Sequence, residues 1–225
     1  MDELDDLIAT INKIKNAVEV NELFIDEIEQ CLQSDDFLLR CDTIEALSIF
    51  MDEKNVQEIV ISMLNDSNYL VRCEACDALS YTVSMQAQYR LLNAGKKDRS
   101  STVRMHAIAS ICHSMKKGGL HEDIIEHLKL AYPKEKSQRV LLAYLSIFYL
   151  IDKDCKYVLE ALRYLNDSDY HIRHNVINLL SDVIDENIIE LVCGEYSKRL
   201  LIEDAQSVKT LLEQEIERLG GEASL

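Results

Sequence analysis

The stretch YLVRCEACDALSYT, residues 69–82, has the spacing of a short amphipathic helix, and the rest of the chain repeats it. Similar stretches begin at Phe37, Ser101 and Tyr170, and each has an arginine at its fourth position. The first three arginines are 32 residues apart, and a diverged copy with Gln138 at the arginine position precedes the last one. Periods of about 30–45 residues are typical of stacked helix pairs. The sequence therefore predicts a stack of two-helix units.

One side of each repeated helix has the character of a protein core. Positions three, four and seven residues after the aligned arginine are small or apolar in nearly every copy. At about 100° per residue, these positions lie on one side of a helix. We expect that side to be buried. Four residues follow the aligned arginines by four positions and test this expectation most directly. They are Ile44, Cys76, Ile108 and Ile177.

A second apolar stretch precedes each copy, so every unit should contain two helices. Turns rich in Asp, Ser and Asn separate several of these helices, and their side-chain oxygens can cap the helix that follows. The expected pairs are 22–33 with 36–51, 54–65 with 68–83, 84–94 with 100–116, 121–131 with 135–151, 154–166 with 169–184, and 186–200 with 204–219.

With this pattern the chain resembles the HEAT-repeat family, in particular its short bacterial form. The family pattern is a Leu, a turn Asp, a Val-Arg pair, then Ala and Leu at helical spacing. The best match comprises Leu64, Asp66, Val71, Arg72, Ala75, Ala78 and Leu79. The resemblance covers residues 20–220 and implies an all-α fold, a right-handed α-solenoid (superhelix) of about six antiparallel helix pairs plus an N-terminal capping helix. It implies little about function, because such repeats serve many scaffolds and some enzymes.

The composition favours a single repeat domain over residues 1–225. The chain has one Pro and six Gly, and no flexible linker divides the repeats. We expect a capping helix at 1–20, five repeats at 21–184, a C-terminal capping pair at 185–219 and a frayed tail at 220–225.

The formal net charge is −16, which argues against general nucleic-acid binding, since a duplex-binding surface must neutralise phosphates. The charge is uneven: residues 1–95 hold 6 basic and 19 acidic side chains, whereas residues 96–139 hold 10 and 5. Nucleic-acid binding through a local basic patch at one edge of the solenoid is therefore a minor alternative. It comprises Lys96, Lys97, Arg99, Lys134 and Lys136.

The sequence favours a cytoplasmic protein that does not cross a membrane. Seven cysteines are an odd number, and the acidic N-terminus does not resemble a secretory signal. The longest apolar run, 140–151, has 12 residues, whereas a spanning helix needs about 20.

No catalytic, metal or cofactor site is predicted. We interpret the arginine row as structural, with each guanidinium bonding turn carboxylates, for which Asp66, Asp98 and Asp167 are the candidates. A lone CxxC at Cys73 and Cys76 lacks the further ligands that zinc needs, so packing is the favoured interpretation.

The polar side of the second helices is the candidate binding surface, and the resemblance places this layer on the concave face of the solenoid. The notable alternative is a merely solvated charged face. Tyr81 is the best single anchor, because aromatic residues with a polar tip dominate binding hot spots. The face should become more apolar at Val140, Ala143 and Ile147. The candidate partner-binding residues are Asp42, Glu45, Glu74, Asp77, Tyr81, Asn178 and Asp182.

These features favour a non-enzymatic protein-binding module that docks a basic protein partner on an acidic face. One form of it would be an immunity or antitoxin protein that covers a basic nuclease. The alternative, which rests on analogy with HEAT-like phycobilin lyases, is an enzyme accessory or lyase-like protein that acts on a cofactor-bearing partner.

Overall fold

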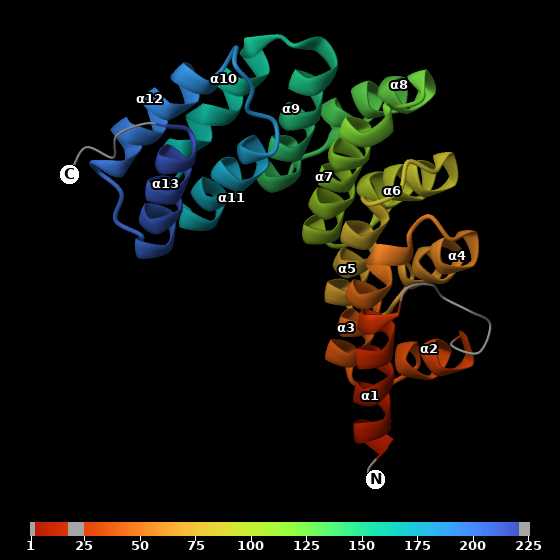
Figure 1. Ribbon diagram of the computed structural model, residues 1–225. Coiled ribbons are helices and arrows are strands. Elements are labelled where there is room, and N and C mark those ends of the chain that lie inside the picture. The colour runs from red at the N-terminus through yellow and green to blue at the C-terminus, as the bar shows by residue number, and fades with distance from the viewer. Residues whose placement is uncertain (1–2, 18–24, 221–225) are drawn as a thin grey trace. The chain divides into compact units, whose positions relative to one another are not determined.

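The protein is described from a computed structural model that covers residues 3–17 and 25–220 (Figure 1). Within these residues every regular element is a helix, which confirms the all-α expectation. The chain forms two compact units, unit 1 at residues 1–130 and unit 2 at residues 131–225. No helix in the described ranges has both the length and the apolar character that crossing a bilayer requires.

Unit 1 begins with a single helix and continues as antiparallel helix pairs. Its helices are α1 (Glu3–Asn16), α2 (Ile25–Leu32), α3 (Phe37–Leu47), α4 (Lys54–Met63), α5 (Tyr69–Leu79), α6 (Met85–Lys97), α7 (Ser101–Gly118) and α8 (Glu122–Ala131). A short 3-10 helix, η2 (Ser48–Phe50), extends α3. The expected end of the capping helix at residues 18–20 and the start of the next helix lie outside the described residues.

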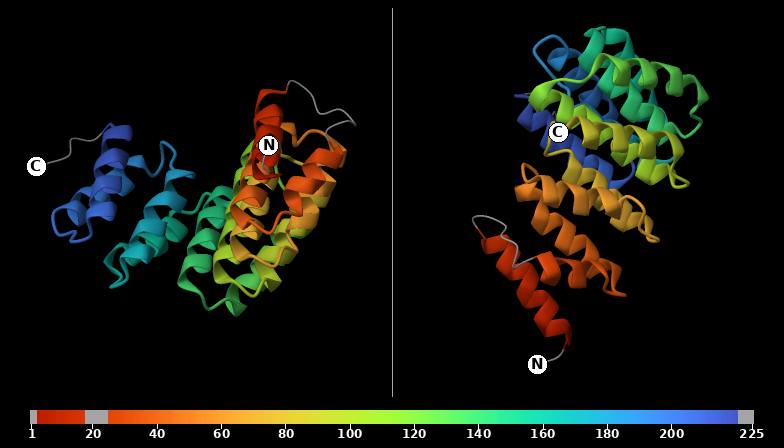
Figure 2. Two further views of the ribbon diagram at one scale, coloured as in Figure 1. Left: turned by 90° about the horizontal axis from the view of Figure 1, so that it is seen from below. Right: turned by 90° about the vertical axis from the view of Figure 1, so that its right-hand side faces the viewer.

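The helices of unit 1 form two layers. Helices α1, α3, α5 and α7 pack side by side in one layer, while α2, α4 and α6 pack against them from the other side, as Figures 1 and 2 show. The second helix of each pair thus lies next to the second helix of the neighbouring pair. This arrangement brings equivalent positions of successive repeats together.

Unit 2 has the same kind of pairing. Its helices are α9 (Gln138–Asp152), α10 (Cys155–Arg163), α11 (Tyr170–Ser181), α12 (Ile189–Leu200) and α13 (Gln206–Arg218). Short 3-10 turns, η3 (Tyr132–Lys134) and η4 (Tyr164–Asn166), precede α9 and α11. Helix α9 packs on α10 and α11, and α13 packs on α11 and α12.

The predicted core positions are buried. Ile44, Cys76, Ile108 and Ile177 are all fully buried, as the periodicity required. The helix bounds also agree with the expected pairs to within a few residues, apart from the connection after Ala94. That connection is short because α6 continues to Lys97.

One expectation about exposed residues is wrong. Val140, Ala143 and Ile147 are fully buried, so they form no apolar part of a surface. Helix α9 is apolar around its whole circumference, and such a helix is buried on every side. In unit 2, Glu215 on α13 is also buried, and its carboxylate is paired with Arg218 at 2.6 Å.

Candidate functional site

The arginine row links successive repeats. Arg40 donates from Nε and Nη2 to the Asp66 carboxylate at 2.9 and 3.0 Å, and from Nη1 to the Ser34 carbonyl at 2.6 Å. Arg72 binds Asp98 in the same way at 2.7 and 2.9 Å. Both guanidinium groups are buried, and planar bidentate pairing uses their donors fully. The structural interpretation of these arginines, with Asp66 and Asp98 as partners, is confirmed.

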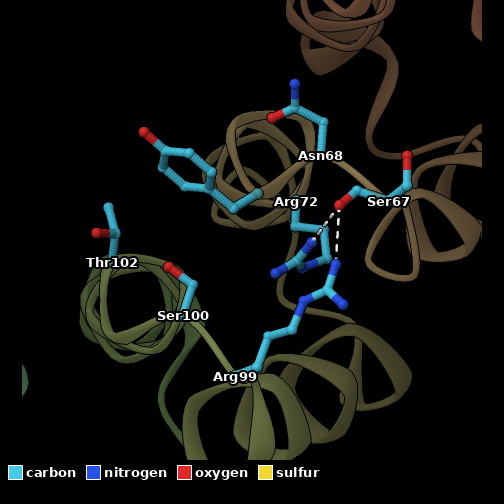
Figure 3. A pocket seen from close by; sticks show the side chains of 7 residues that line it. Ser67, Asn68, Arg72, Arg99, Ser100 and Thr102 are labelled. Atoms are coloured by element: carbon cyan, nitrogen blue, oxygen red, sulfur yellow. Dashed lines mark hydrogen bonds between the residues drawn. The ribbon is translucent and has the colours of Figure 1, made fainter.

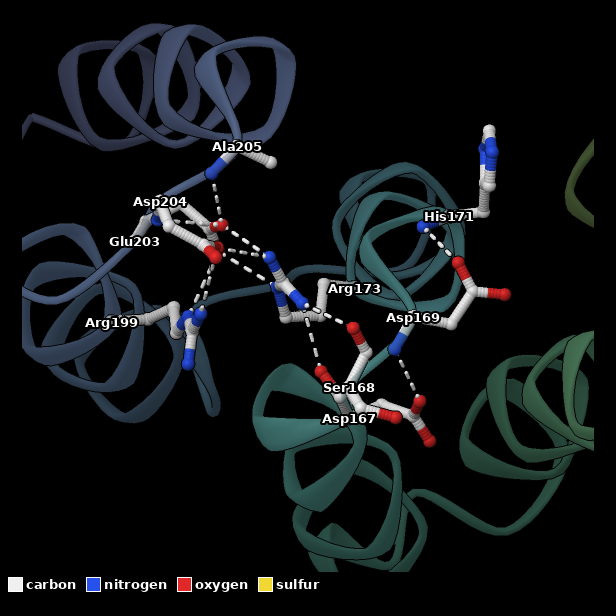
Figure 4. Close-up of polar contacts among 9 residues, drawn as sticks. All are labelled: Asp167, Ser168, Asp169, His171, Arg173, Arg199, Glu203, Asp204 and Ala205. Carbon is white, nitrogen blue, oxygen red and sulfur yellow. Dashed lines mark hydrogen bonds and ion pairs between the residues drawn. The ribbon is translucent and has the colours of Figure 1, made fainter.

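The row continues in unit 2 with a change of partner. Gln138, in the arginine position, donates to Asp167 at 3.0 Å. Arg173 donates to the buried carboxylate of Glu203, which also accepts from Arg199 at 2.8 Å and from the backbone N–H of Ala205 at 2.9 Å (Figure 4). The spacing could have predicted this pair, since Glu203 follows Arg173 by 30 residues, much as Asp66 follows Arg40 by 26.

Several side chains of the expected basic patch interact with other parts of the chain. Arg99 donates to the Ser67 carbonyl at 2.9 Å, and Arg72 donates to the same oxygen at 3.2 Å, at the edge of an open pocket (Figure 3). Lys96 and Lys97 lie in the last turn of α6, where cations complement the helix dipole. The remaining patch residues, Lys134 and Lys136, belong to unit 2.

Four of the predicted partner-binding residues lie together in unit 1. Asp42 and Glu45 are on α3, and Glu74 and Asp77 are on the neighbouring α5. Burial first, and then the negative charges of Asp77 and Glu45, raise the pKa of Glu74 above its ordinary value. The carboxylates therefore repel one another. We call these four residues the acidic face.

A histidine closes one end of the acidic face. His106 on α7 places Nδ1 at 2.9 Å from both carboxylate oxygens of Asp77. Burial lowers the pKa of His106, but the hydrogen bond and the charge of Asp77 outweigh it, and the pKa lies above its ordinary value. This pairing between adjacent repeats was not predicted. At the other end, Lys15 on α1 lies 3.5 Å from Glu45.

Tyr81 is exposed just beyond the end of α5, as an anchor residue should be. Its ring centroid lies 5.9 Å from that of His113, and Lys117 Nζ lies 4.4 Å from the ring centroid. The remaining two predicted residues are on or next to α11 in unit 2. Asn178 is exposed and lies 3.1 Å from His174, and Asp182 is exposed after the helix ends. These two are therefore not part of the acidic face of unit 1.

The cysteine pair has the properties of core residues. Cys73 and Cys76 are buried in α5, and burial raises the pKa of Cys73 to about 12 and that of Cys76 well above its ordinary value. Their thiols are therefore protonated at neutral pH, whereas metal ligands and redox nucleophiles are thiolates. No group of three or more His, Cys, Asp or Glu suited to a metal ion occurs among the described residues.

The fold and the repeat geometry agree with comparisons to known proteins. A family model for HEAT repeats matches residues 25–112. The chain contains HEAT repeats. The matched residues run from the start of α2 into α7, and so include the acidic face. Comparison with curated protein sequences gives no significant match.

Two solved structures resemble this chain in fold. The YibA protein of Escherichia coli has 18% sequence identity and a TM-score of 0.58, with 93% of this chain and 73% of that chain covered. The complex of CpcE and CpcF of phycocyanin lyase from Nostoc sp. PCC7120 has 15% identity and a TM-score of 0.58, with 97% and 90% covered. At these identities the likeness shows the fold alone.

Proposed function

We propose that this HEAT-repeat chain is a non-enzymatic protein-binding module that docks a basic protein partner on its acidic face. The observation that carries the proposal is the grouping of Asp42, Glu45, Glu74 and Asp77 on two adjacent helices. Burial, and after it the negative charges of Asp77 and Glu45, raise the pKa of Glu74, so part of the shift comes from repulsion within this group. Cations of a partner would relieve that repulsion.

The charge of unit 1 would also guide the approach of such a partner. Residues 1–95 hold 19 acidic and 6 basic side chains, and so attract a positively charged protein over a distance. Association of this kind is fast and depends strongly on salt. An inhibitor that covers a basic enzyme, as an immunity protein does, is one role that fits this chemistry.

The test is to remove the four charges without changing side-chain shape. In the variant Asp42→Asn, Glu45→Gln, Glu74→Gln and Asp77→Asn, we expect affinity for a lysine-rich peptide to fall by about tenfold or more at low salt. The dependence of affinity on salt should weaken in parallel, since fewer charges take part. Isothermal titration calorimetry across a salt series measures both quantities.

The matched control removes four exposed carboxylates elsewhere and so changes the net charge equally. It is Asp52→Asn, Glu126→Gln, Glu186→Gln and Glu217→Gln. If the control lowers affinity as much as the acidic-face variant does, only net charge matters and the proposed docking surface is wrong. Equal affinity of the acidic-face variant and the wild type would also show that the proposed docking surface is wrong, because removal of its four charges would then have no effect on binding.

The alternative, an accessory or lyase-like protein that acts on a cofactor-bearing partner, has fold likeness as its support. The phycocyanin lyase complex and YibA resemble this chain with the same TM-score, so the fold likeness does not favour a lyase-like role over other roles. Recovery of a partner that carries a covalently attached cofactor would favour this alternative over docking of a basic protein.

A further inference from the structure

Large apolar side chains are exposed on both sides of the acidic face. On α3 and the 3-10 helix η2 after it, the order along the chain is Leu38, Asp42, Glu45, Ile49, and on α5 and the turn after it the order is Leu70, Glu74, Asp77, Tyr81. The spacing of four and three residues puts the first three members of each set on one side of the helix, and Ile49 and Tyr81 each follow two residues after the helix ends. The exposed fractions of the apolar members are 57% for Leu38, 64% for Ile49, 40% for Leu70 and 53% for Tyr81.

We call these four residues the apolar flanks. Single exposed apolar residues are ordinary on protein surfaces. Here, however, they recur at equivalent positions of two adjacent repeats, with the carboxylates between them. A surface that is acidic in the middle and apolar on both sides is complementary to a partner that is basic in the middle and apolar on both sides.

The dimensions of this surface select the shape of that partner. Eleven residues separate the two flanks of each helix, which corresponds to about 16 Å at 1.5 Å per residue. An α-helix with its side chains is about 10–12 Å across, so it can lie over the carboxylates and contact both flanks. An extended segment is narrower, since neighbouring strands lie only about 5 Å apart, and it would reach one flank at a time.

The spacing along the surface also matches a helix. Packed helices such as α3 and α5 have axes about 8–10 Å apart, so that distance separates the two pairs of carboxylates. In a helix that crosses both, residues seven apart are separated by about 10.5 Å. Lysines or arginines at that interval would each face one pair of carboxylates.

Basic side chains of the chain itself limit the length of the surface. Lys15 lies 3.5 Å from Glu45 at one end, and His106 lies 2.9 Å from Asp77 at the other. The third repeat also has no matching flanks, because Thr102 and His113 occupy the equivalent positions. The docking surface therefore spans two repeats.

We propose that the partner presents an amphipathic basic helix, which lies across α3 and α5 with a row of Lys or Arg over the acidic face and apolar side chains on the apolar flanks. This inference rests on the proposed function, since it names the class of basic partner that the face takes. The acidic face favours basic residues along the middle of the helix surface that it contacts. The apolar flanks favour apolar residues on both sides of that basic row.

Three peptides of about 18 residues, or roughly 27 Å as helices, provide the test, and the first two have equal composition. The first has lysines seven residues apart with leucines on both sides of that row. The second has the same residues in an order that spreads the leucines around the helix. The third keeps the first order but has one residue exchanged for a central proline, which breaks a helix. We expect the first to bind the wild-type chain about tenfold tighter than either of the others.

A variant of the flanks separates their role from that of the charges. In Ile49→Ser with Tyr81→Ser, we expect the first and second peptides to bind equally, with the salt dependence kept. The matched control is Leu201→Ser with Ile202→Ser, which removes two apolar residues that are 72% and 67% exposed in unit 2. The control should keep the preference for the first peptide.

The outcomes distinguish the two proposals. If no basic peptide binds the wild-type chain, docking of a basic protein fails and the helix inference fails with it. If all three peptides bind with equal affinity, the docking proposal stands and the inference of a helix is overturned. Dimerisation of the wild-type chain that the Ile49→Ser and Tyr81→Ser variant lacks would also overturn it, since the flanks would then belong to a contact between copies.

Discussion

At the scale of single residues, a few buried ion pairs join one repeat to the next. Arg40 and Arg72 each bond a carboxylate 26 residues further along the chain, and each also binds backbone carbonyls of its own turn. Burial of a charge is costly unless every donor and acceptor is satisfied. Because these groups are satisfied only when two repeats are in register, the pairs select one relative placement of neighbouring repeats.

The pair formed by Arg173 and Glu203 gives the clearest prediction at this scale. Removing one partner of a buried pair leaves an uncompensated charge, so we expect Glu203→Gln to lower the free energy of unfolding by about 3 kcal/mol. Asp204→Asn is the control: Asp204 also bonds Arg173 at 2.7 Å, but its side chain is 84% exposed, and we expect less than about 1 kcal/mol. Urea unfolding of both variants measures the difference, and equal losses would contradict the assignment.

The same pair gives the protein a dependence on pH. Burial alone would raise the pKa of Glu203, but hydrogen bonds from Arg173 and Arg199 hold it well below the ordinary range. A lowered pKa means that this stabilisation is present above the pKa of the unfolded state, about 4.3, and is lost as pH falls towards the folded-state value. The stability difference between wild type and Glu203→Gln should therefore shrink below that pH.

At the scale of elements, caps and close contacts set where helices begin and how they pair. Asp36, Asn68, Asp154 and Asp169 each accept a hydrogen bond from the backbone N–H two residues later, which satisfies a free donor of the helix that follows. Helices α6 and α7 approach each other closely at Gly95. A Cβ atom there would lie 2.6 Å from Cδ1 and 3.1 Å from Cγ1 of Ile108.

Two glycine substitutions test that close contact. Helix propensity alone favours alanine over glycine by about 1 kcal/mol. We expect that gain for Gly194→Ala, because nothing lies within 4 Å of the new Cβ atom. For Gly95→Ala we expect a loss of about 1–3 kcal/mol, since Ile108 must move within a packed core. Thermal unfolding of both variants gives the signs, and stabilisation by both would show that the α6 and α7 contact is loose.

At the scale of the whole molecule, stability is distributed over neighbouring repeats rather than held in one core. Each repeat contacts mainly its neighbours, so a local change should act mainly on the nearest helices. In hydrogen exchange, we expect Glu203→Gln to accelerate amide exchange in α11 to α13 much more than in α3 and α5. Equal acceleration throughout would mean that the chain unfolds as a single cooperative unit.

The helix pairs were predictable because their determinants are local. The spacing of Ile44, Cys76 and Ile108 relative to the arginines marks the buried side, and any helix with that spacing must cover it. The acidic face was predictable for a related reason. Its four carboxylates sit at repeated positions, and stacking in register brings repeated positions together.

The sequence by itself determined the repeat, its helices, the buried side and the location of the carboxylates, since each follows from spacing along one helix. Only the tertiary structure decided that His106 pairs with Asp77 and that Val140 is buried. These facts depend on which side chains from different helices meet. Contacts between residues about 30 positions apart arise only when the stacked helices fix their distance, and no pattern within one helix encodes them.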